Sequence, residues 1–242
     1  MRSLLVYIYA ALQILGSVPR LLTIDKKAKS VTGQKQDELY FETPKLVSQR
    51  VFKKTGSTIE VVGQENLPAG PALFVANHQG LFDILVLLGY LGKPIGFIAK
   101  QEIKKIPIIP QWMVKIHCVF LNRSDRRGAI QVMNDGIENL EAGHSMVIFP
   151  EGTRSRGTTV HEFKPGSLRL GTKAGVPIIP VAINGTYKIM EEKDGSLQAA
   201  HVQLTICEPI SPEQYEGMKN QEIAVQIQQT IEDVVIPNGR IL

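Results

Sequence analysis

A histidine and an aspartate five residues apart have the side-chain types and the spacing for acid–base chemistry. His78 follows the apolar run ALFVAN, and Asp83 opens the apolar stretch DILVLLGYL. Residues five apart lie on different faces of one helix, so the two side chains meet only if His78 precedes the helix and Asp83 lies in its first turn. The carboxylate can then accept an imidazole N–H and leave the other ring nitrogen free to remove a proton from a hydroxyl group. The alternative is a loop histidine beside a helix-capping aspartate.

Four residues after a second apolar run have the composition of a phosphate-binding loop. The run MVIF leads through a proline into Glu151, Gly152, Thr153 and Arg154. Backbone N–H groups are unobstructed at a glycine, and a guanidinium matches a phosphate with two parallel hydrogen bonds. The segment lacks the P-loop pattern, so a surface turn with a solvated arginine is the alternative.

Basic residues follow two further apolar runs. Arg123 comes directly after HCVFLN, and an arginine just after a buried strand is held near a site at the strand end. We therefore expect Arg123 to bind the same anionic group, and Arg126 and Arg127 to be solvated at the start of a helix. Lys100, Lys104 and Lys105 follow the run IGFIA and are expected to add positive potential, although at least one of them should be solvated.

Strand-like and helix-like segments alternate along the chain and must position these residues. The strand candidates are STIEVVG, ALFVAN, IGFIA, IHCVFL, SMVIFP, IIPVAIN and HVQLTI, and the helical stretches are 82–91, 101–115, 126–142, 166–175 and 212–234. This order predicts an α/β fold with a mostly parallel or mixed sheet flanked by helices. Active sites of such sheets lie where strands end and helices begin.

Two prolines and two cysteines lie in the apolar runs. Pro177 and Pro180 in VPIIPVAING indicate an edge strand or a wall against an acyl chain, with core packing as the default. Cys118 and Cys207 are 89 residues apart, which is neither a disulfide framework nor a zinc spacing. We expect both cysteines to be core residues of a protein from a reducing compartment.

The charge is divided unevenly along the 242 residues, although the net charge is only +4. Residues 1–60 contain ten basic and five acidic side chains, and residues 93–127 contain eight and two. Two separate basic zones indicate an anionic surface and an anionic ligand, and argue against a nucleic-acid partner. The length favours one large domain, residues 56–242, after an amino-terminal segment, residues 1–55.

The amino-terminal segment has the features of a membrane-associated helix. Residues 3–19 contain no charge and would extend about 25 Å as a helix, near the lower limit for crossing a hydrocarbon layer of roughly 30 Å. A helix lying in one leaflet is therefore as reasonable as a transmembrane helix, and a cleaved signal peptide is a third possibility. Residues 42–54 predict an amphipathic helix with lysines and arginine around its apolar side, as expected near anionic lipid.

Four sequence blocks together resemble one enzyme family. NHQGLFD, FLNR, FPEGTRS and VPIIPVA resemble, in this order, the four blocks of the glycerolipid acyltransferases that act on 1-acylglycerol 3-phosphate. The resemblance implies that His78 is the general base and that Asp83 orients it. It also implies that Arg123, Glu151, Gly152 and Arg154 bind the glycerol phosphate, and that the block of Pro180 lines the acyl or substrate pocket.

The resemblance further implies a membrane enzyme on the cytoplasmic face that makes phosphatidic acid. An acyl chain would pass directly from a thioester of acyl carrier protein or coenzyme A to the sn-2 hydroxyl of the lysophosphatidic acid, without metal or cofactor. Glycerol 3-phosphate or another lysophospholipid is the alternative acceptor. A peripheral anionic-lipid-binding protein is the non-enzymatic alternative. A metal-dependent phosphohydrolase using His78, Asp83, His117 and His144 lacks close ligand spacing.

Overall fold

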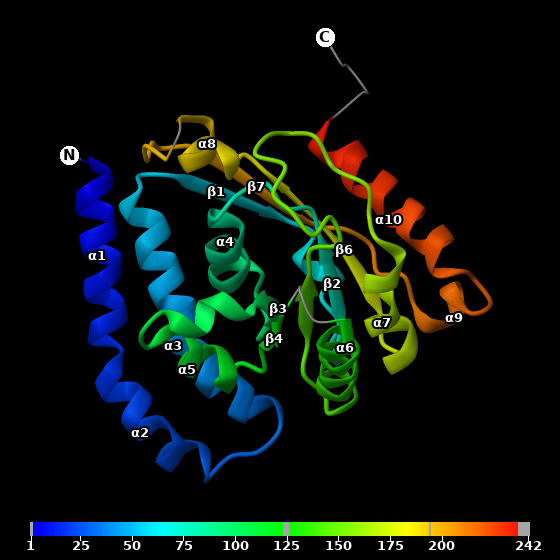
Figure 1. The fold of residues 1–242 in the computed structure, drawn as a ribbon, viewed down its shortest axis with the longest axis horizontal. Coiled ribbons are helices and arrows are strands. Elements are labelled where there is room, and N and C mark those ends of the chain that lie inside the picture. The colour runs from blue at the N-terminus through cyan, green and yellow to red at the C-terminus, as the bar shows by residue number, and fades with distance from the viewer. Residues whose placement is uncertain (1, 123–125, 194, 237–242) are drawn as a thin grey trace.

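The computed structural model describes residues 2–122, 126–193 and 195–236, in which seven strands form one sheet in the order β1-β7-β6-β2-β5-β3-β4 (Figure 1). Every neighbouring pair is parallel except β6 and β7. The strands are β1 (Thr58–Val62), β2 (Leu73–Ala76), β3 (Gly96–Lys100), β4 (Val119–Leu121), β5 (Met146–Ile148), β6 (Ile178–Asn184) and β7 (His201–Ile206). Each lies within a predicted strand, except that β3 extends one residue beyond IGFIA to Lys100, so the mixed α/β fold is confirmed.

Most predicted helices are present, but the helical residues 20–28, 34–41 and 187–190 were not predicted, and two predicted helices are interrupted. They are α1 (Arg2–Gly16), α2 (Val18–Ala28), α3 (Gln34–Lys54), α4 (Phe82–Tyr90), α5 (Ile109–Lys115), α6 (Arg126–Glu141), α7 (Arg169–Ala174), α8 (Tyr187–Met190), α9 (Pro212–Tyr215) and α10 (Asn220–Val235). The expected helix 101–115 breaks at Ile106, which is extended because Pro107 follows it. The expected helix 212–234 breaks at Gly217, whose φ is +77°.

Helices cover both faces of the sheet, and the strands alternate their side chains between two cores. Phe74 and Ala76 of β2 pack into the core beneath α3, α4 and α5, whereas Leu73 and Val75 pack into the core beneath α6, α7 and α10. Figure 1 shows these two helical layers on opposite sides of the sheet. Burial on both faces explains why the strands read as near-continuous apolar runs. Cys118 and Cys207 are buried free thiols, as expected of core residues.

Strand β6 is an interior strand in which Pro180 is buried, so the edge alternative is wrong and core packing, the default expectation, is confirmed. It lies between β7 and β2, and Pro180 pairs with Val75 of β2. The carbonyl of Pro180 still accepts a hydrogen bond of 2.9 Å from the Cys207 N–H. The pairing of β6 with β7 ends at Val181 and Ile206, so Pro180 lies just beyond its end. The backbone N–H that proline lacks would have fallen there, so its absence removes little of the hydrogen bonding between the two strands.

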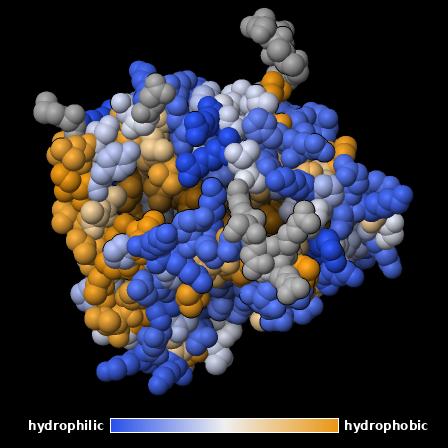
Figure 2. All heavy atoms as spheres, in the orientation of Figure 1, coloured by the Kyte–Doolittle hydropathy of each residue, from blue (hydrophilic) through white to orange (hydrophobic). Residues whose placement is uncertain are grey.

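The amino-terminal helices pack against the layer of α3 and leave an apolar face uncovered. Arg2–Ala28 is long and apolar enough, by length and composition, to cross a membrane, and little of its most apolar part is buried. The exposed apolar side chains on α1 and α2 are Leu4, Leu5, Tyr7, Ile8, Leu12, Leu15 and Leu22. Figure 2 shows them as a continuous hydrophobic surface along one side of the molecule.

Candidate active site

The loop between β2 and α4 carries His78 and is fixed from both sides. Asn77 donates to and accepts from the backbone of Ile183 in β6, at 2.9 and 2.8 Å. The carbonyls of His78 and Gln79 accept the N–H groups of Ser155 and Arg156, at 2.8 and 3.2 Å. Because β2, β5 and β6 are parallel, their carboxyl ends meet at one edge, and the loops that follow them hold each other.

His78 and Asp83 have the geometry of an oriented base. Nδ1 of His78 lies 2.7 Å from Oδ2 of Asp83, which occupies the first turn of α4 and is fully buried. The same oxygen accepts the Gly80 N–H at 2.9 Å, and the buried Thr186 hydroxyl donates to Oδ1. An ionised carboxylate only accepts hydrogen bonds, so the proton lies on Nδ1 and Nε2 keeps its lone pair.

The ring of His78 is also held by an aromatic neighbour. The Phe149 ring stacks on it with a centroid separation of 4.1 Å and an interplanar angle of 20°. The His78 side chain is 16% exposed, so the ring is shielded on one face yet accessible to a substrate. Phe149 follows β5 directly, so the end of this strand helps to set the ring orientation.

Glu151 joins the His78 loop to the segment after β5. Its two carboxylate oxygens accept the backbone N–H groups of His78, at 2.6 Å, and His161, at 3.0 Å. Burial raises the pKa of this carboxyl, and the two N–H groups act in the opposite direction. With both oxygens engaged by backbone, Glu151 positions the loop, and direct contact with a ligand stays a prediction.

Arg154 brings a cation to the same loop. Its Nη1 lies 3.9 Å from Oε1 of Glu191, and that oxygen accepts the Leu81 N–H at 2.8 Å. The Arg154 side chain is 41% exposed, whereas that of Glu191 is 5% exposed. Burial raises the pKa of Glu191, and Arg154 is among the groups that oppose this. The guanidinium is thus loosely held on one side and open to an anion on the other.

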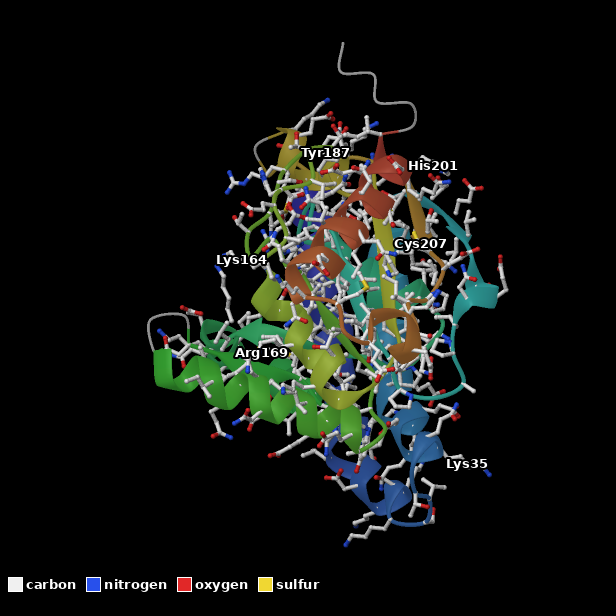
Figure 3. All side chains as sticks on the ribbon, turned by 90° about the vertical axis from the view of Figure 1, so that its right-hand side faces the viewer. Lys35, Lys164, Arg169, Tyr187, His201 and Cys207 are labelled. Carbon is white, nitrogen blue, oxygen red and sulfur yellow. The ribbon has the colours of Figure 1, made fainter. Side chains whose placement is uncertain are left out.

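A second cation lies against the loop at Gly152. The φ of Gly152 is +70°, and a Cβ there would lie 2.9 Å from Nζ of Lys164. The positive φ favours glycine at this position, whereas the flexible Lys164 side chain could move away from a Cβ. Lys164 and Thr153 are exposed, and Figure 3 shows Lys164 projecting from the ribbon.

The remaining predicted cations are not joined to the His78 loop in the described part of the chain. Lys100 lies at the end of β3 and Lys105 in the 3₁₀ helix Gln101–Lys105, and both are exposed. Lys104 places its Nζ 4.7 Å from the Phe120 ring centroid, so its charge faces an aromatic face. Arg123 lies outside the described residues.

The sequence reasoning missed five side chains at or beside this site: Gln79, Phe149, Lys164, Thr186 and Glu191. Oε1 of the fully buried Gln79 accepts the Gly185 N–H at 2.9 Å, which fixes the loop after β6. Thr186 and Glu191 come shortly after this strand in the segment GTYKIMEE. Their position after a parallel strand was the available signal, because such ends gather at one edge.

Comparisons with known proteins find similar chains. Residues 58–184 match the model of the family described as Acyltransferase. The chain is 40% identical over 155 residues to a chloroplastic 1-acyl-sn-glycerol-3-phosphate acyltransferase of Arabidopsis thaliana, covering 63% of this chain and 43% of that protein. It is 32% identical over 183 residues to a 1-acyl-sn-glycerol-3-phosphate acyltransferase of Saccharomyces cerevisiae, covering 74% of this chain and 60% of that protein.

A solved structure is similar over almost the whole chain. The crystal structure of a 1-acyl-sn-glycerophosphate acyltransferase from Thermotoga maritima superposes with a TM-score of 0.78 and 28% sequence identity, covering 97% of this chain and 96% of that one. The chain therefore spans about half the length of the curated plant and yeast relatives and nearly all of this bacterial structure.

Proposed function

Because this chain belongs to the Acyltransferase family, we propose that it transfers an acyl group from a thioester to the sn-2 hydroxyl of 1-acyl-sn-glycerol 3-phosphate and so forms phosphatidic acid. The observation that carries the proposal is the backbone bonding of the Arg154 segment to the His78 loop. This bonding supports the proposal, because it ties the loop of the proposed base to the segment of the proposed phosphate ligand. The activities of the plant, yeast and bacterial relatives support this choice of substrate.

The proposed reaction is a direct transfer with His78 as base. Nε2 removes the proton of the hydroxyl group, and the oxygen attacks the thioester carbonyl. The tetrahedral intermediate collapses, the C–S bond breaks, and the imidazolium returns its proton to the leaving thiolate. Asp83 stabilises the imidazolium from the Nδ1 side. A positioned base contributes about 10²- to 10⁴-fold, and orientation of the substrates contributes much of the rest.

We assign the acceptor phosphate to the cations at the carboxyl edge of the sheet. Arg154 is the principal ligand, because its guanidinium is exposed beside the His78 loop and can offer parallel N–H donors. Gly152 and Thr153 extend the binding loop, and Arg123 completes the set proposed from the sequence. Lys100 and Lys105 supply positive potential from exposed positions.

The amino-terminal helices are proposed to dock on a membrane with α1 in one leaflet. Polar contacts fasten α1 and its end to the rest of the chain, including Gln13 with Arg50 at 3.0 Å and Ser17 with Trp112 at 2.9 Å. If α1 crossed the bilayer, the polar groups that contact it would have to enter the hydrocarbon layer or lose these contacts, and either change costs free energy. The exposed apolar face fits the leaflet, and the basic residues of 1–55 fit anionic headgroups.

The membrane face is proposed to be cytoplasmic, with residues 56–242 forming the catalytic unit. Two free cysteines suit a reducing compartment. The acyl donor is then a thioester of acyl carrier protein or of coenzyme A.

An acceptor and donor panel tests the proposed function. Purified full-length protein in mixed micelles is supplied with 1-acyl-sn-glycerol 3-phosphate, glycerol 3-phosphate or lysophosphatidylcholine, each with acyl carrier protein and coenzyme A thioesters. We expect labelled phosphatidic acid from the first acceptor with at least one donor. Product only from another acceptor would contradict the substrate, and vesicle binding without thioester consumption would support the non-enzymatic alternative.

A further inference from the structure

Three side chains with metal-binding atoms meet at the edge of the sheet opposite to His78. Asp37 lies in the first turn of α3, His117 lies in the turn before β4, and His144 lies just before β5. Nε2 of His117 lies 3.1 Å from Oδ1 of Asp37, and Nδ1 of His144 lies 2.6 Å from Oδ2. Since the strands here run parallel to β2, their starts lie far from the edge that carries the proposed chemistry.

The backbone holds the two histidines in place. His117 has a φ of +59°, a conformation that a non-glycine residue keeps only when its surroundings enforce it. Asn139 donates to the His117 carbonyl at 3.1 Å and accepts the His144 N–H at 2.9 Å, so one residue orders both segments. Gly96 allows the turn to approach, because a Cβ there would lie 2.7 Å from the His117 carbonyl oxygen.

The three side chains line a small cavity. Its volume is about 10 Å³, and Phe41 and Ile95 form part of its wall. This is about the space that one water molecule occupies. The side chains of Asp37, His117 and His144 are 12%, 29% and 20% exposed, so the site is shielded but reachable.

We propose that Asp37, His117 and His144 bind a divalent transition-metal ion of the zinc class, which fastens α3 to the sheet. The three ligand atoms lie within 4.8 Å of one another. Two imidazole nitrogens and one carboxylate suit zinc, cobalt or nickel, whereas magnesium and calcium prefer oxygen ligands. Three protein ligands leave a fourth position for water.

Binding of a metal ion would change the orientation of the two imidazole rings and fix their tautomers. The imidazole rings now lie 13° from parallel with centroids 3.4 Å apart. A metal ion lies near the plane of each ring that ligates it, so the rings must rotate apart. Each ligating nitrogen must offer its lone pair, so a neutral imidazole that ligates the ion carries its proton on the other ring nitrogen.

Metal titration of the full-length protein tests this site. Protein purified in detergent and stripped with a chelator is titrated with Co²⁺, followed by visible absorption, and with Zn²⁺, followed by calorimetry and thermal unfolding. We expect one ion per chain, a raised Tm with Zn²⁺, and no comparable rise with Mg²⁺. Asp37→Asn and His144→Gln should each weaken the affinity at least ~10-fold.

His201→Gln is the matched control. His201 has a 65% exposed side chain, and Figure 3 shows it at the end of the molecule opposite to Lys35, which precedes Asp37 by two residues. The control should bind one ion with unchanged affinity. His117→Asn, which keeps a residue tolerant of positive φ, replaces either ligand variant that fails to fold. Absence of Co²⁺ binding, or equal binding by the folded ligand variants, would overturn the proposal.

Discussion

The replacement of Asp83 by asparagine separates the charge of the carboxylate from its role in orienting His78. An asparagine carbonyl can accept the N–H groups of His78 and Gly80, as Oδ2 does now. Its NH₂ group then faces the Thr186 hydroxyl, which can accept this hydrogen bond and donate to Oε1 of Gln79, 3.3 Å away. The structure therefore predicts that Asp83→Asn retains the tautomer with the proton on Nδ1 and loses only the negative charge.

The magnitude follows from the ion pair that forms during the reaction. For charge centres about 4 Å apart and an effective dielectric constant of ~20, the attraction between imidazolium and carboxylate is about 4 kcal/mol. Loss of this energy in the transition state lowers kcat roughly 10³-fold, because each 1.36 kcal/mol is tenfold in rate. The KM for either substrate should change little.

A double variant tests the retained tautomer. In Asp83→Asn with Thr186→Val, the amide loses the hydroxyl that accepts its NH₂ group, so its orientation is no longer fixed. We expect a further loss of about tenfold in kcat, whereas Thr186→Val alone should cost less than Asp83→Asn. Phosphatidic acid formation by the purified variants is the assay, with circular dichroism and Tm as folding controls. If folded Asp83→Asn keeps more than a tenth of the wild-type kcat, the role given to the carboxylate is wrong.

Three further predictions address the phosphate, a buried carboxyl and the membrane face. Arg154→Ala should raise the KM for the phosphorylated acceptor about 30-fold, for a charged pair worth roughly 2 kcal/mol, and leave the KM for the thioester within about twofold; equal changes would contradict the assignment. Burial raises the pKa of Glu191 in the folded chain, so the folded state favours the protonated carboxyl. The free energy of unfolding is therefore highest below the ordinary pKa of a glutamate and falls as the pH rises through the raised pKa. Chemical denaturation between pH 4.5 and 7 should therefore show a steeper loss of stability with rising pH for wild type than for Glu191→Gln, and parallel curves would refute this. Leu12→Glu on α1 should reduce sedimentation with anionic vesicles, while Ile130→Glu on α6, where the residue is similarly exposed (59% and 66%), should not; equal loss in both would argue against docking through α1.

The sequence predicts the sheet well because strands buried on both faces are written as near-continuous apolar runs. The seven strand candidates were recognisable from β-branched runs bounded by turn residues. Pro180 was misleading, because proline usually marks an edge, whereas here the neighbouring strand β7 ends where the missing N–H would be needed. The first turns of α3, with the sequence QKQDELYF, carry few apolar residues, so packing rather than periodicity establishes that part of the helix.

The candidate site was predictable where its residues lie close together in the sequence. It was less predictable where residues from distant segments meet. The relation of His78 to Asp83 follows from a loop and the helix after it. Thr186 is 103 residues from Asp83, and no spacing pattern joins them. Likewise Asp37 is 80 residues from His117, so the proposed metal site becomes visible only in three dimensions.

The acyl transfer rate of the His78→Ala variant tests the central claim most directly. Ser155 and Glu151 bond to the backbone of residue 78 and not to its ring, so the loop should keep its shape without the imidazole. Purified His78→Ala should therefore fold with a Tm near that of wild type, bind anionic vesicles, and form phosphatidic acid at a rate lower by ~10³-fold or more. Substantial phosphatidic acid formation by the folded variant would contradict the account.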